Sequence, residues 1–230
     1  DVVAIRQVLC SGRAKYLLAG RTIIQMGTIG SEDSRMLGEE IEALGGDYLE
    51  APVLGSKAEA LAGTLSIMVG GTPEHFTRWH ALLADLGPSP RHIGPVGAAA
   101  SLKLALNQLI AAENTAFALS LGMVQGAGVS VEIFLDFLRA SALYAQAFDK
   151  KLSRLLSRDY ANPNFPTQHL LKDVNLVEVE AQAHGLTTAG LDGIRSLLER
   201  TINAGWGEAD YSAVFEAVVP RGTDGNSSGD

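Results

Sequence analysis

The segment VGAAASLKLALNQLIAAENTAF, Val96–Phe117, indicates how the chain is built. Its apolar residues recur around most of a helical circumference, and no proline interrupts them, which predicts a long and largely buried helix over about residues 97–126. Lys103 is the only ionisable residue between Gly97 and Leu106. The question that this helix raises is why a lysine stands among alanines and leucines.

The sequence on the two sides of residues 92–96 differs in its periodicity. Up to about Gly94, short strand-like runs alternate with helical runs, which predicts a parallel α/β sheet. After Gly94 the strand signals largely vanish, and an all-α bundle is expected. The expected strands are 22–26, 47–53 and 64–71; the expected helices are 31–46, which begins with Ser31 as a capping residue, then 57–62, 73–86, 130–140, 142–157, 167–184, 188–204 and 210–217.

This pattern predicts the later part of a nucleotide-binding domain over residues 1–94, followed by an all-α substrate domain over residues 95–219. The composition of residues 220–230 predicts a disordered tail. The chain starts without methionine, inside what reads as an amphipathic helix, and we therefore expect a further segment before Asp1. Neither a G-x-G-x-x-G nor a G-x-x-x-x-G-K-[ST] phosphate loop occurs, which agrees with that expectation.

Composition argues against several classes of partner. The formal net charge is −8 and no basic run occurs, whereas nucleic acids and anionic membranes require clustered lysine and arginine. No apolar stretch is long enough to predict a membrane span. The single cysteine, Cys10, excludes an internal disulfide and is typical of a cytoplasmic protein. The five histidines show no metal-ligand spacing, so we predict no metal site.

On the predicted long helix, Lys103 shares one face with two asparagines. Asn107 and Asn114 follow at intervals of four and eleven residues, which places all three within about 40° of one another. One interpretation is a solvated polar stripe on the surface. The other is a desolvated ammonium with a lowered pKa, oriented by an amide, that exchanges a proton with an oxygen atom of a substrate.

Two further stretches carry weaker signals. DYLEAPVLGSKAEALAGTL, residues 47–65, joins two strands through a loop in which Gly55 allows close backbone approach and Ser56 offers donors for a carboxylate. An ordinary loop is the alternative. FPTQHLLKDVNL, residues 165–176, contains Lys172 and Asp173, which on their own are equally typical of a surface pair.

Taken in order, these stretches resemble the β-hydroxyacid dehydrogenase family. EAPVLGSKAEALAGTL is similar to its D-x-P-V-S-G-G-x-x-x-A-x-x-G-T-L loop, GPVGAAASLKLALNQL to its G-x-x-G-x-x-x-K-x-x-N-N segment, and KDVNLVEV to its K-D-x-x-L-A motif. TIIQMGTIGSEDS resembles the strand that ends in D-M-S-T. The resemblance covers residues 1–217 and implies a Rossmann-type α/β domain, incomplete at its N-terminus, joined by a long helix to an all-α domain.

The resemblance also implies an activity, the interconversion of a short 3-hydroxy acid and its semialdehyde with NAD or NADP. Lys103 would be the general acid and base, and Asn107 would position it or the substrate. Thr28 and Lys172 would contact the cofactor, whose phosphate loop would precede Asp1. The sequence does not indicate which of the two cofactors is preferred.

The substrate, a small carboxylate, would meet Leu54, Gly55 and Ser56 in the loop and Phe165 as a wall, while Asp173 would support the helix of Lys172. Leu54 replaces the serine of many family members, and this form of the loop is nearer to the glyoxylate/succinic semialdehyde reductases.

Leu54 is one departure from the family pattern, and the second is that Gln25 and Gly27 replace the usual aspartate and serine near the nicotinamide. The resemblance, together with the apolar surface of the long helix, predicts a homodimer or homotetramer assembled through the helical domain.

The alternatives to a hydroxy-acid dehydrogenase are an imine reductase of the same fold, in which the lysine is typically absent, and a non-catalytic binding or assembly protein.

Overall fold

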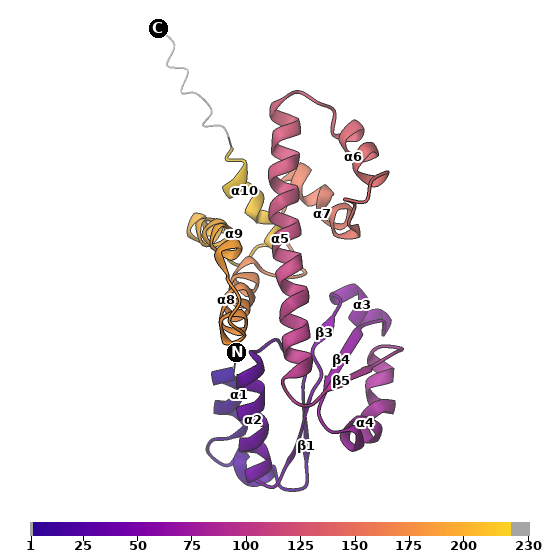
Figure 1. The fold of residues 1–230 in the computed structure, drawn as a ribbon, viewed down its shortest axis with the longest axis vertical. Helices are drawn as coiled ribbons and strands as arrows, with labels where there is room; N and C mark the ends of the chain where they lie inside the picture. Colours follow the sequence, from indigo (N-terminus) through magenta and orange to yellow (C-terminus); the bar gives the residue numbers. More distant parts are fainter. Residues whose placement is uncertain (1, 222–230) are drawn as a thin grey trace. The chain divides into compact units, whose positions relative to one another are not determined.

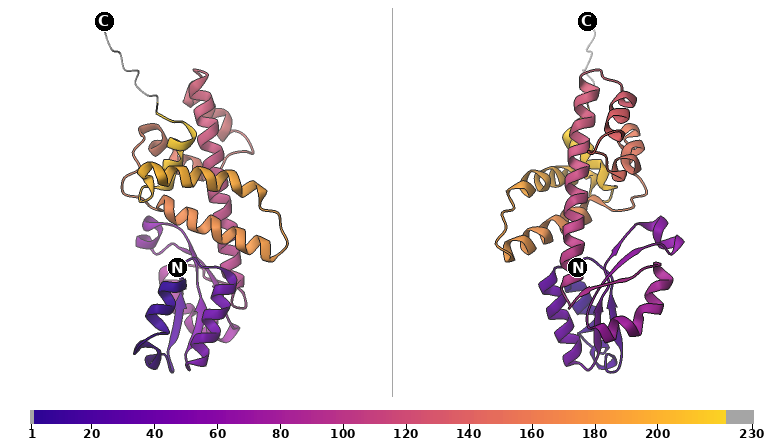
Figure 2. Two further views of the ribbon diagram at one scale, coloured as in Figure 1. Left: turned by 90° about the vertical axis from the view of Figure 1, so that its left-hand side faces the viewer. Right: turned by 45° about the vertical axis from the view of Figure 1, so that its right-hand side comes forward.

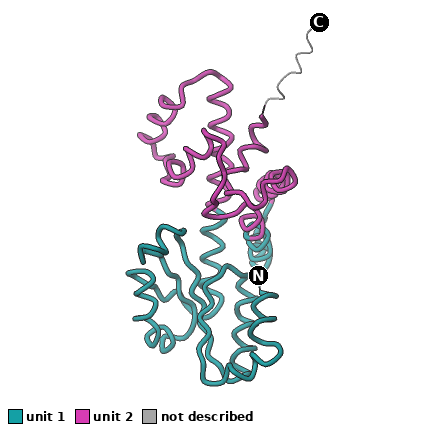
Figure 3. The backbone as a smooth tube through the Cα atoms, turned by 180° about the vertical axis from the view of Figure 1, so that it is seen from behind, with its two compact units in different colours: residues 1–108, 173–188 teal, residues 109–172, 189–230 magenta. Residues whose placement is uncertain are grey.

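The structure is a computed structural model that describes residues 2–221, and these residues form two compact units. The first unit contains the residues up to 108 together with 173–188, and the second contains 109–172 together with the residues from 189 onward (Figure 3). Helix α5, Ala98–Gly126, and helix α8, Thr167–Ala183, each contribute residues to both units. The predicted disordered tail, residues 220–230, lies outside the described residues except for Pro220 and Arg221.

The first unit is built on a five-stranded mixed sheet (Figure 1). Its strands are β1 Thr22–Gln25, β2 Asp47–Glu50, β3 Val53–Leu54, β4 Ser66–Gly70 and β5 Arg91–Gly94. The order is β1-β2-β4-β3, with β5 paired to β4. The β1–β2 and β4–β5 pairs are parallel, whereas β4 runs antiparallel to β2 and β3.

The predicted α/β sheet with parallel strands is confirmed for the β1–β2 and β4–β5 pairs, but the pairing of β4 with β2 and β3 differs from the prediction. The chain reaches β4 from β3 through only the short helix α3, Lys57–Ala62. A connection this short joins antiparallel neighbours, whereas a parallel pair needs a longer crossover. Strand β5 was not predicted, and the expected strand 47–53 is interrupted at Ala51 and Pro52.

Helices cover both faces of this sheet (Figures 1 and 2). They are α1 Val2–Leu9, α2 Ser31–Ala43 and α4 Pro73–Leu86. Side chains alternate across β2, so that Tyr48 packs with Leu37 of α2 on one face while Leu49 packs with Leu83 of α4 on the other. The burial of these apolar side chains holds the helices to the sheet.

The second unit is helical, as predicted. Besides parts of α5 and α8 it contains α6 Val131–Arg139, α7 Gln146–Ser157, α9 Ala189–Thr201, a short π-helix Ile202–Trp206, a 3₁₀ turn Tyr211–Ala213 and α10 Val214–Val218. Within residues 2–221, no helix combines the length and the apolar character that crossing a membrane requires.

The start of α2 differs from the prediction. Gly30 stands at the N-cap and makes no side-chain cap, whereas Ser31 is the first helical residue. The hydroxyl of Ser31 instead donates to a carboxylate oxygen of Glu180, at 2.6 Å. The Ser31 side chain, which the local sequence predicts to cap the helix, therefore forms a tertiary contact with Glu180 instead.

Glu50 joins the sheet to the start of helix α5. This carboxylate, at the end of β2, is 2% exposed. Its Oε1 atom accepts hydrogen bonds from the backbone N–H groups of Gly97 at 2.9 Å, Ala99 at 2.8 Å and Ala100 at 3.3 Å. These donors have no partner inside the helix, and a negative group at a helix N-terminus is also favoured by the helix dipole. One side chain therefore fixes where α5 begins.

Neighbouring residues hold the Glu50 carboxylate in place. The Ser34 hydroxyl donates to Glu50 Oε2 and lies 3.0 Å from the Tyr48 hydroxyl. Burial raises the pKa of Tyr48 to about 12, so this hydroxyl stays protonated. Because the single Ser34 proton is directed at Glu50, the Tyr48 hydroxyl is the donor in its hydrogen bond with Ser34. A Cβ atom at Gly70, the residue opposite Glu50 in β4, would lie 2.1 Å from Glu50 Oε1. Glycine at this position leaves room for the carboxylate.

We expect Glu50→Gln to lower the free energy of unfolding by about 1–3 kcal/mol, because the charge at the start of α5 and an acceptor for Ser34 are lost. Chemical denaturation of the two proteins measures this difference. The matched control is Glu42→Gln, on the exposed side of α2, which we expect to leave stability within about 0.5 kcal/mol of the original. Equal stability of the Glu50 and Glu42 variants would contradict the capping role.

Candidate active site

Lys103 and Asn107 lie on α5 in the first unit, one helical turn apart. Lys103 is half-buried, while Asn107 is only 2% exposed. The Asn107 Nδ2 atom donates to Asp173 Oδ2 of helix α8 at 2.6 Å. This bond fixes the orientation of the amide and leaves its Oδ1 atom buried, without a hydrogen-bond partner among the described residues. An oriented acceptor therefore lies on the helix face of Lys103.

Asn114 continues this face of α5 into the second unit. It is 7% exposed, and its Nδ2 atom donates to the backbone carbonyl of Tyr211 at 3.4 Å. The interpretation of a solvated stripe is therefore wrong for Asn107 and Asn114, which are both buried. A polar side chain that is buried has lost its hydration, so that its hydrogen bonds within the protein become the interactions that orient it.

A second polar contact joins α5 to α8 within the first unit. The hydroxyl of Ser101 donates to Glu180, which also accepts from Ser31 of α2. Burial alone would raise the pKa of Glu180, but the hydroxyl donors outweigh that effect and keep the pKa below its usual range. Glu180 was not among the site residues predicted from the sequence. Its distance from Asp173, seven residues or about two helical turns, was a signal that both side chains lie on one face of α8.

Leu54 is the last residue of β3, and the candidate residues Gly55 and Ser56 follow in the loop to α3, all in the first unit. Gly55 has φ +132°, and a Cβ atom there would lie 2.8 Å from Leu65 Cδ2, so the loop requires glycine. Ser56 caps α3, and both its backbone N–H and its hydroxyl donate to Glu59 Oε2, at 2.8 and 2.7 Å. The donors assigned to a substrate carboxylate are directed at a carboxylate of the chain itself.

Thr28 follows the C-terminal end of β1, where β1 and β2 run parallel. The C-terminal ends of parallel strands are where doubly wound sheets bind their ligands. Gln25, the last residue of β1, is buried at this edge, and neither its Oε1 nor its Nε2 atom has a hydrogen-bond partner among the described residues. The Gln25 amide can therefore form hydrogen bonds with a polar ligand at this edge, such as a nicotinamide dinucleotide.

Phe165 and Lys172 belong to the second unit. The Phe165 ring meets the Tyr211 ring edge-on, with centroids 5.9 Å apart, and the Phe165 carbonyl accepts from the Tyr211 N–H at 3.0 Å. Lys172 is half-buried on α8, directly before Asp173. The first unit thus contains Lys103, Asn107, Asp173, Thr28 and the loop residues 54–56, whereas the second contains Phe165 and Lys172.

For metals, the described part of the chain contains no group of three or more histidine, cysteine, aspartate or glutamate side chains with the geometry to hold an ion. The polar groups found at the candidate site are an ammonium, amides, hydroxyls and carboxylates. These groups bind and orient oxygen-containing substrates and exchange protons with them.

Comparison with known proteins identifies relatives of both parts of the chain. Residues 2–94 match the family model described as the NAD binding domain of 6-phosphogluconate dehydrogenase, and residues 97–218 match the NAD-binding model of NADP-dependent 3-hydroxyisobutyrate dehydrogenase. Glyoxylate/succinic semialdehyde reductase 1 of Arabidopsis thaliana is 29% identical over 90% of this chain and 71% of its own length.

Two further similarities extend over most of the chain. The 2-hydroxy-3-oxopropionate reductase of Escherichia coli is 31% identical over 95% of this chain and 75% of its own length. A crystal structure of 3-hydroxyisobutyrate dehydrogenase from Salmonella typhimurium superimposes with a TM-score of 0.83 at 25% identity, covering 94% of this chain and 75% of the other. The chain belongs to the β-hydroxyacid dehydrogenase family of NAD(P)-dependent oxidoreductases.

Proposed function

We propose that this protein interconverts a short hydroxy acid and the corresponding semialdehyde, with glyoxylate and succinic semialdehyde as the favoured substrates, and that Lys103 is its general acid and base. The observation that carries the proposal is the Asn107–Asp173 hydrogen bond of 2.6 Å, which orients a buried amide one turn from Lys103. The sequence of the substrate loop, with leucine at position 54, and the name of the similar plant reductase support this choice of substrate.

In the direction of reduction, the substrate carbonyl carbon gains a hydride and its oxygen gains a proton. A bound nicotinamide supplies the hydride. The Lys103 ammonium donates the proton to the carbonyl oxygen, which becomes the hydroxyl of the product, and the lysine is left neutral. In oxidation the neutral amine takes the hydroxyl proton. Such proton transfer typically accelerates a reaction by about a hundredfold or more.

Asn107 would position the proton donor. Because Asp173 holds its Nδ2 atom, the Oδ1 atom is available to accept a hydrogen bond from the Lys103 ammonium or the substrate hydroxyl. Asp173 therefore acts through Asn107 as a positioning residue, in addition to supporting the helix that carries Lys172. A fixed amide limits the directions in which the ammonium can point, which favours the reactive geometry.

The substrate carboxylate would be held by the backbone at Gly55 and by Ser56, while Leu54 offers an apolar contact and Phe165 a wall. In the structure the Ser56 donors bind Glu59. A substrate carboxylate would have to replace this internal carboxylate, so we expect only modest affinity from Ser56 itself. Thr28 and Lys172 would contact the cofactor, with residues 1–94 as the cofactor domain and 95–219 as the substrate domain. NADPH and NADH are both candidates.

We further propose that the protein assembles as a homodimer or homotetramer through its helical unit. Large apolar side chains are exposed there: Leu119 and Met123 on α5, and Ile133 and Phe137 on α6, with Phe137 77% exposed. Covering exposed apolar side chains of this size with a second copy of the protein lowers the free energy of the assembly. We also propose a cytoplasmic location, which the single cysteine, Cys10, supports.

The catalytic proposal predicts that Lys103→Ala lowers kcat for glyoxylate or succinic semialdehyde by about a hundredfold or more. Steady-state assays with NADPH and with NADH measure the effect, and affinity for the cofactor should change little. Lys150→Ala, on an exposed part of α7, is the matched control and should retain full turnover.

Three outcomes decide between the candidate functions. A kcat of the Lys103→Ala variant within tenfold of that of the original protein would refute the assigned mechanism. Faster turnover of cyclic imines than of any semialdehyde would favour the imine reductase alternative. Absence of turnover with every substrate, in a protein that still binds NADPH, would favour a binding or assembly protein.

For the assembly, light scattering should give the mass of a dimer or a tetramer. Phe137→Glu should shift that mass toward the monomer, because the variant buries a charge in the apolar contact. Leu61→Glu, at a 91% exposed position on α3 of the first unit, should leave the mass unchanged. A monomeric mass for the unmodified protein would contradict the proposal.

A further inference from the structure

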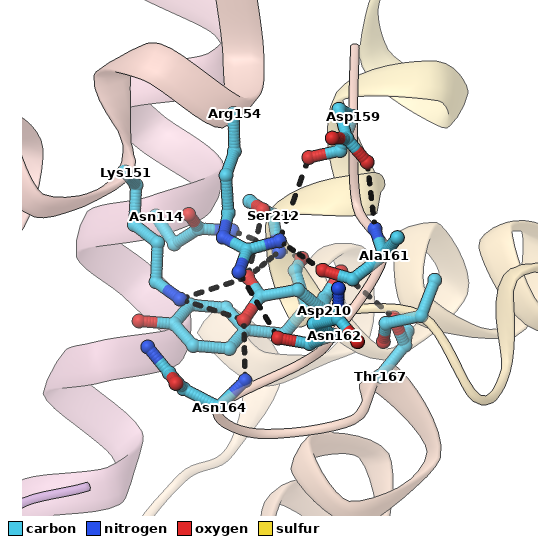
Figure 4. A network of polar contacts seen from close by, with 12 residues as sticks. Asn114, Lys151, Arg154, Asp159, Ala161, Asn162, Asn164, Thr167, Asp210 and Ser212 are labelled. Atoms are coloured by element: carbon cyan, nitrogen blue, oxygen red, sulfur yellow. Dashed lines mark hydrogen bonds and ion pairs between the residues drawn. The ribbon is translucent and has the colours of Figure 1, made fainter. Parts of the chain in front are cut away.

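A buried ion pair in the second unit lies at the junction of three chain segments (Figure 4). Lys151 of α7 and Asp210 are 7% and 0% exposed. The Lys151 Nζ atom lies 2.8 Å from Asp210 Oδ1 and 2.9 Å from Oδ2, and 4.1 Å from the centre of the Tyr211 ring. The pair is therefore closed on all sides by the protein.

Further donors converge on the same carboxylate. Asp210 Oδ1 accepts from the Ser212 N–H at 3.1 Å and from its hydroxyl at 2.7 Å, and Oδ2 accepts from the Asn164 N–H at 3.2 Å. Burial would raise the pKa of Asp210, but the Lys151 ammonium and Ser212 outweigh this effect and keep the pKa below its usual range. Asp210 is thus held as a carboxylate that binds α7, the segment before α8 and the 3₁₀ turn together.

These contacts fix the position of the Phe165 backbone and the residue at which α8 begins. The Asn164 N–H is bound to the Asp210 side chain, and the Phe165 carbonyl is bound to the Tyr211 N–H. The Thr167 hydroxyl, at the first residue of α8, donates to the Ala209 carbonyl at 3.1 Å and lies 3.4 Å from the Asp210 carbonyl. Residues 164–167 are therefore tied at successive positions to residues 209–211. Lys172 follows five residues later on the same helix.

A buried ion pair adds little net stability, because the loss of hydration offsets most of the electrostatic attraction. Apolar side chains of similar size would fill the same space at no greater cost. What they would not supply is direction: a carboxylate with four separate donors defines the relative positions of three chain segments. The pair therefore contributes geometry to the segment that contains Phe165.

We propose that Lys151 and Asp210 are positioning residues for substrate binding, which fix residues 164–167 and so place Phe165 against the substrate. The inference rests on the proposed function, because Phe165 is a wall of the site only if the protein binds the carboxylate substrate proposed above. Lys151 and Asp210 act through Asn164, Tyr211 and Phe165 and do not themselves touch the substrate.

The test compares Lys151→Met with Lys150→Met, its exposed neighbour on α7, by two measurements on the full chain. Amide hydrogen exchange should accelerate in Lys151→Met at Asn164, Tyr211 and Ser212 and remain unchanged in the control. The KM for succinic semialdehyde should rise about tenfold or more while kcat falls less, because a displaced wall weakens binding of the substrate before it affects proton transfer at Lys103. Lys151→Arg, which keeps the charge, should recover most of the KM.

Faster exchange at these amides with an unchanged KM would overturn the positioning role and leave the proposed function intact. Unchanged exchange would overturn it as well, since the pair would then not fix the segment. Should Lys151→Met fail to unfold cooperatively, Ser212→Ala, which removes one donor to Asp210, replaces it: a rise in KM supports the role, and an unchanged KM refutes it. Failure of the unmodified protein to turn over any semialdehyde would instead count against the proposed function.

Discussion

The contact between the Glu50 carboxylate and the first turn of α5 determines the geometry on which the candidate active site depends. Three backbone N–H groups converge on one oxygen atom, and a buried chain of hydroxyls from Tyr48 and Ser34 holds the other. Lys103 is only one turn further along the same helix. Because an α-helix is stiff over such a length, the position of the ammonium relative to the ends of β1 and β2 follows from this capping contact.

Buried polar contacts then fix the side chains that the helix carries. Asp173 orients the Asn107 amide, and Glu180 receives the hydroxyls of Ser101 and Ser31, so that α5 and α8 meet through polar groups at two levels. In the second unit the buried Lys151–Asp210 pair fixes the segment that contains Phe165 in a similar way. Both sets are costly to bury and therefore contribute more to geometry than to stability.

Local sequence was sufficient to predict the helices and the face that Lys103 shares with Asn107, because helical periodicity depends only on spacing along the chain. Local sequence could not predict which groups the side chains on that face contact. Whether Asn107 meets water or a carboxylate depends on Asp173, which is 66 residues away. The direction of β4 and the existence of β5 also depended on pairing between distant segments, which short apolar runs do not encode. Ser31 shows the same limit, since a tertiary contact with Glu180 replaces the expected cap.

The proposed mechanism requires that the Lys103 amine itself transfers the proton, which chemical rescue of a Lys103→Ala variant can test. Small primary amines such as methylamine can enter the space left by Lys103→Ala and act as a diffusible acid. We expect the turnover of the variant to rise in proportion to amine concentration and to vary with the pKa of the amine, whereas the turnover of the unmodified protein should not respond to added amine. A folded Lys103→Ala protein whose turnover does not respond to any amine, yet stays near that of the unmodified protein, would show that Lys103 is not the proton donor.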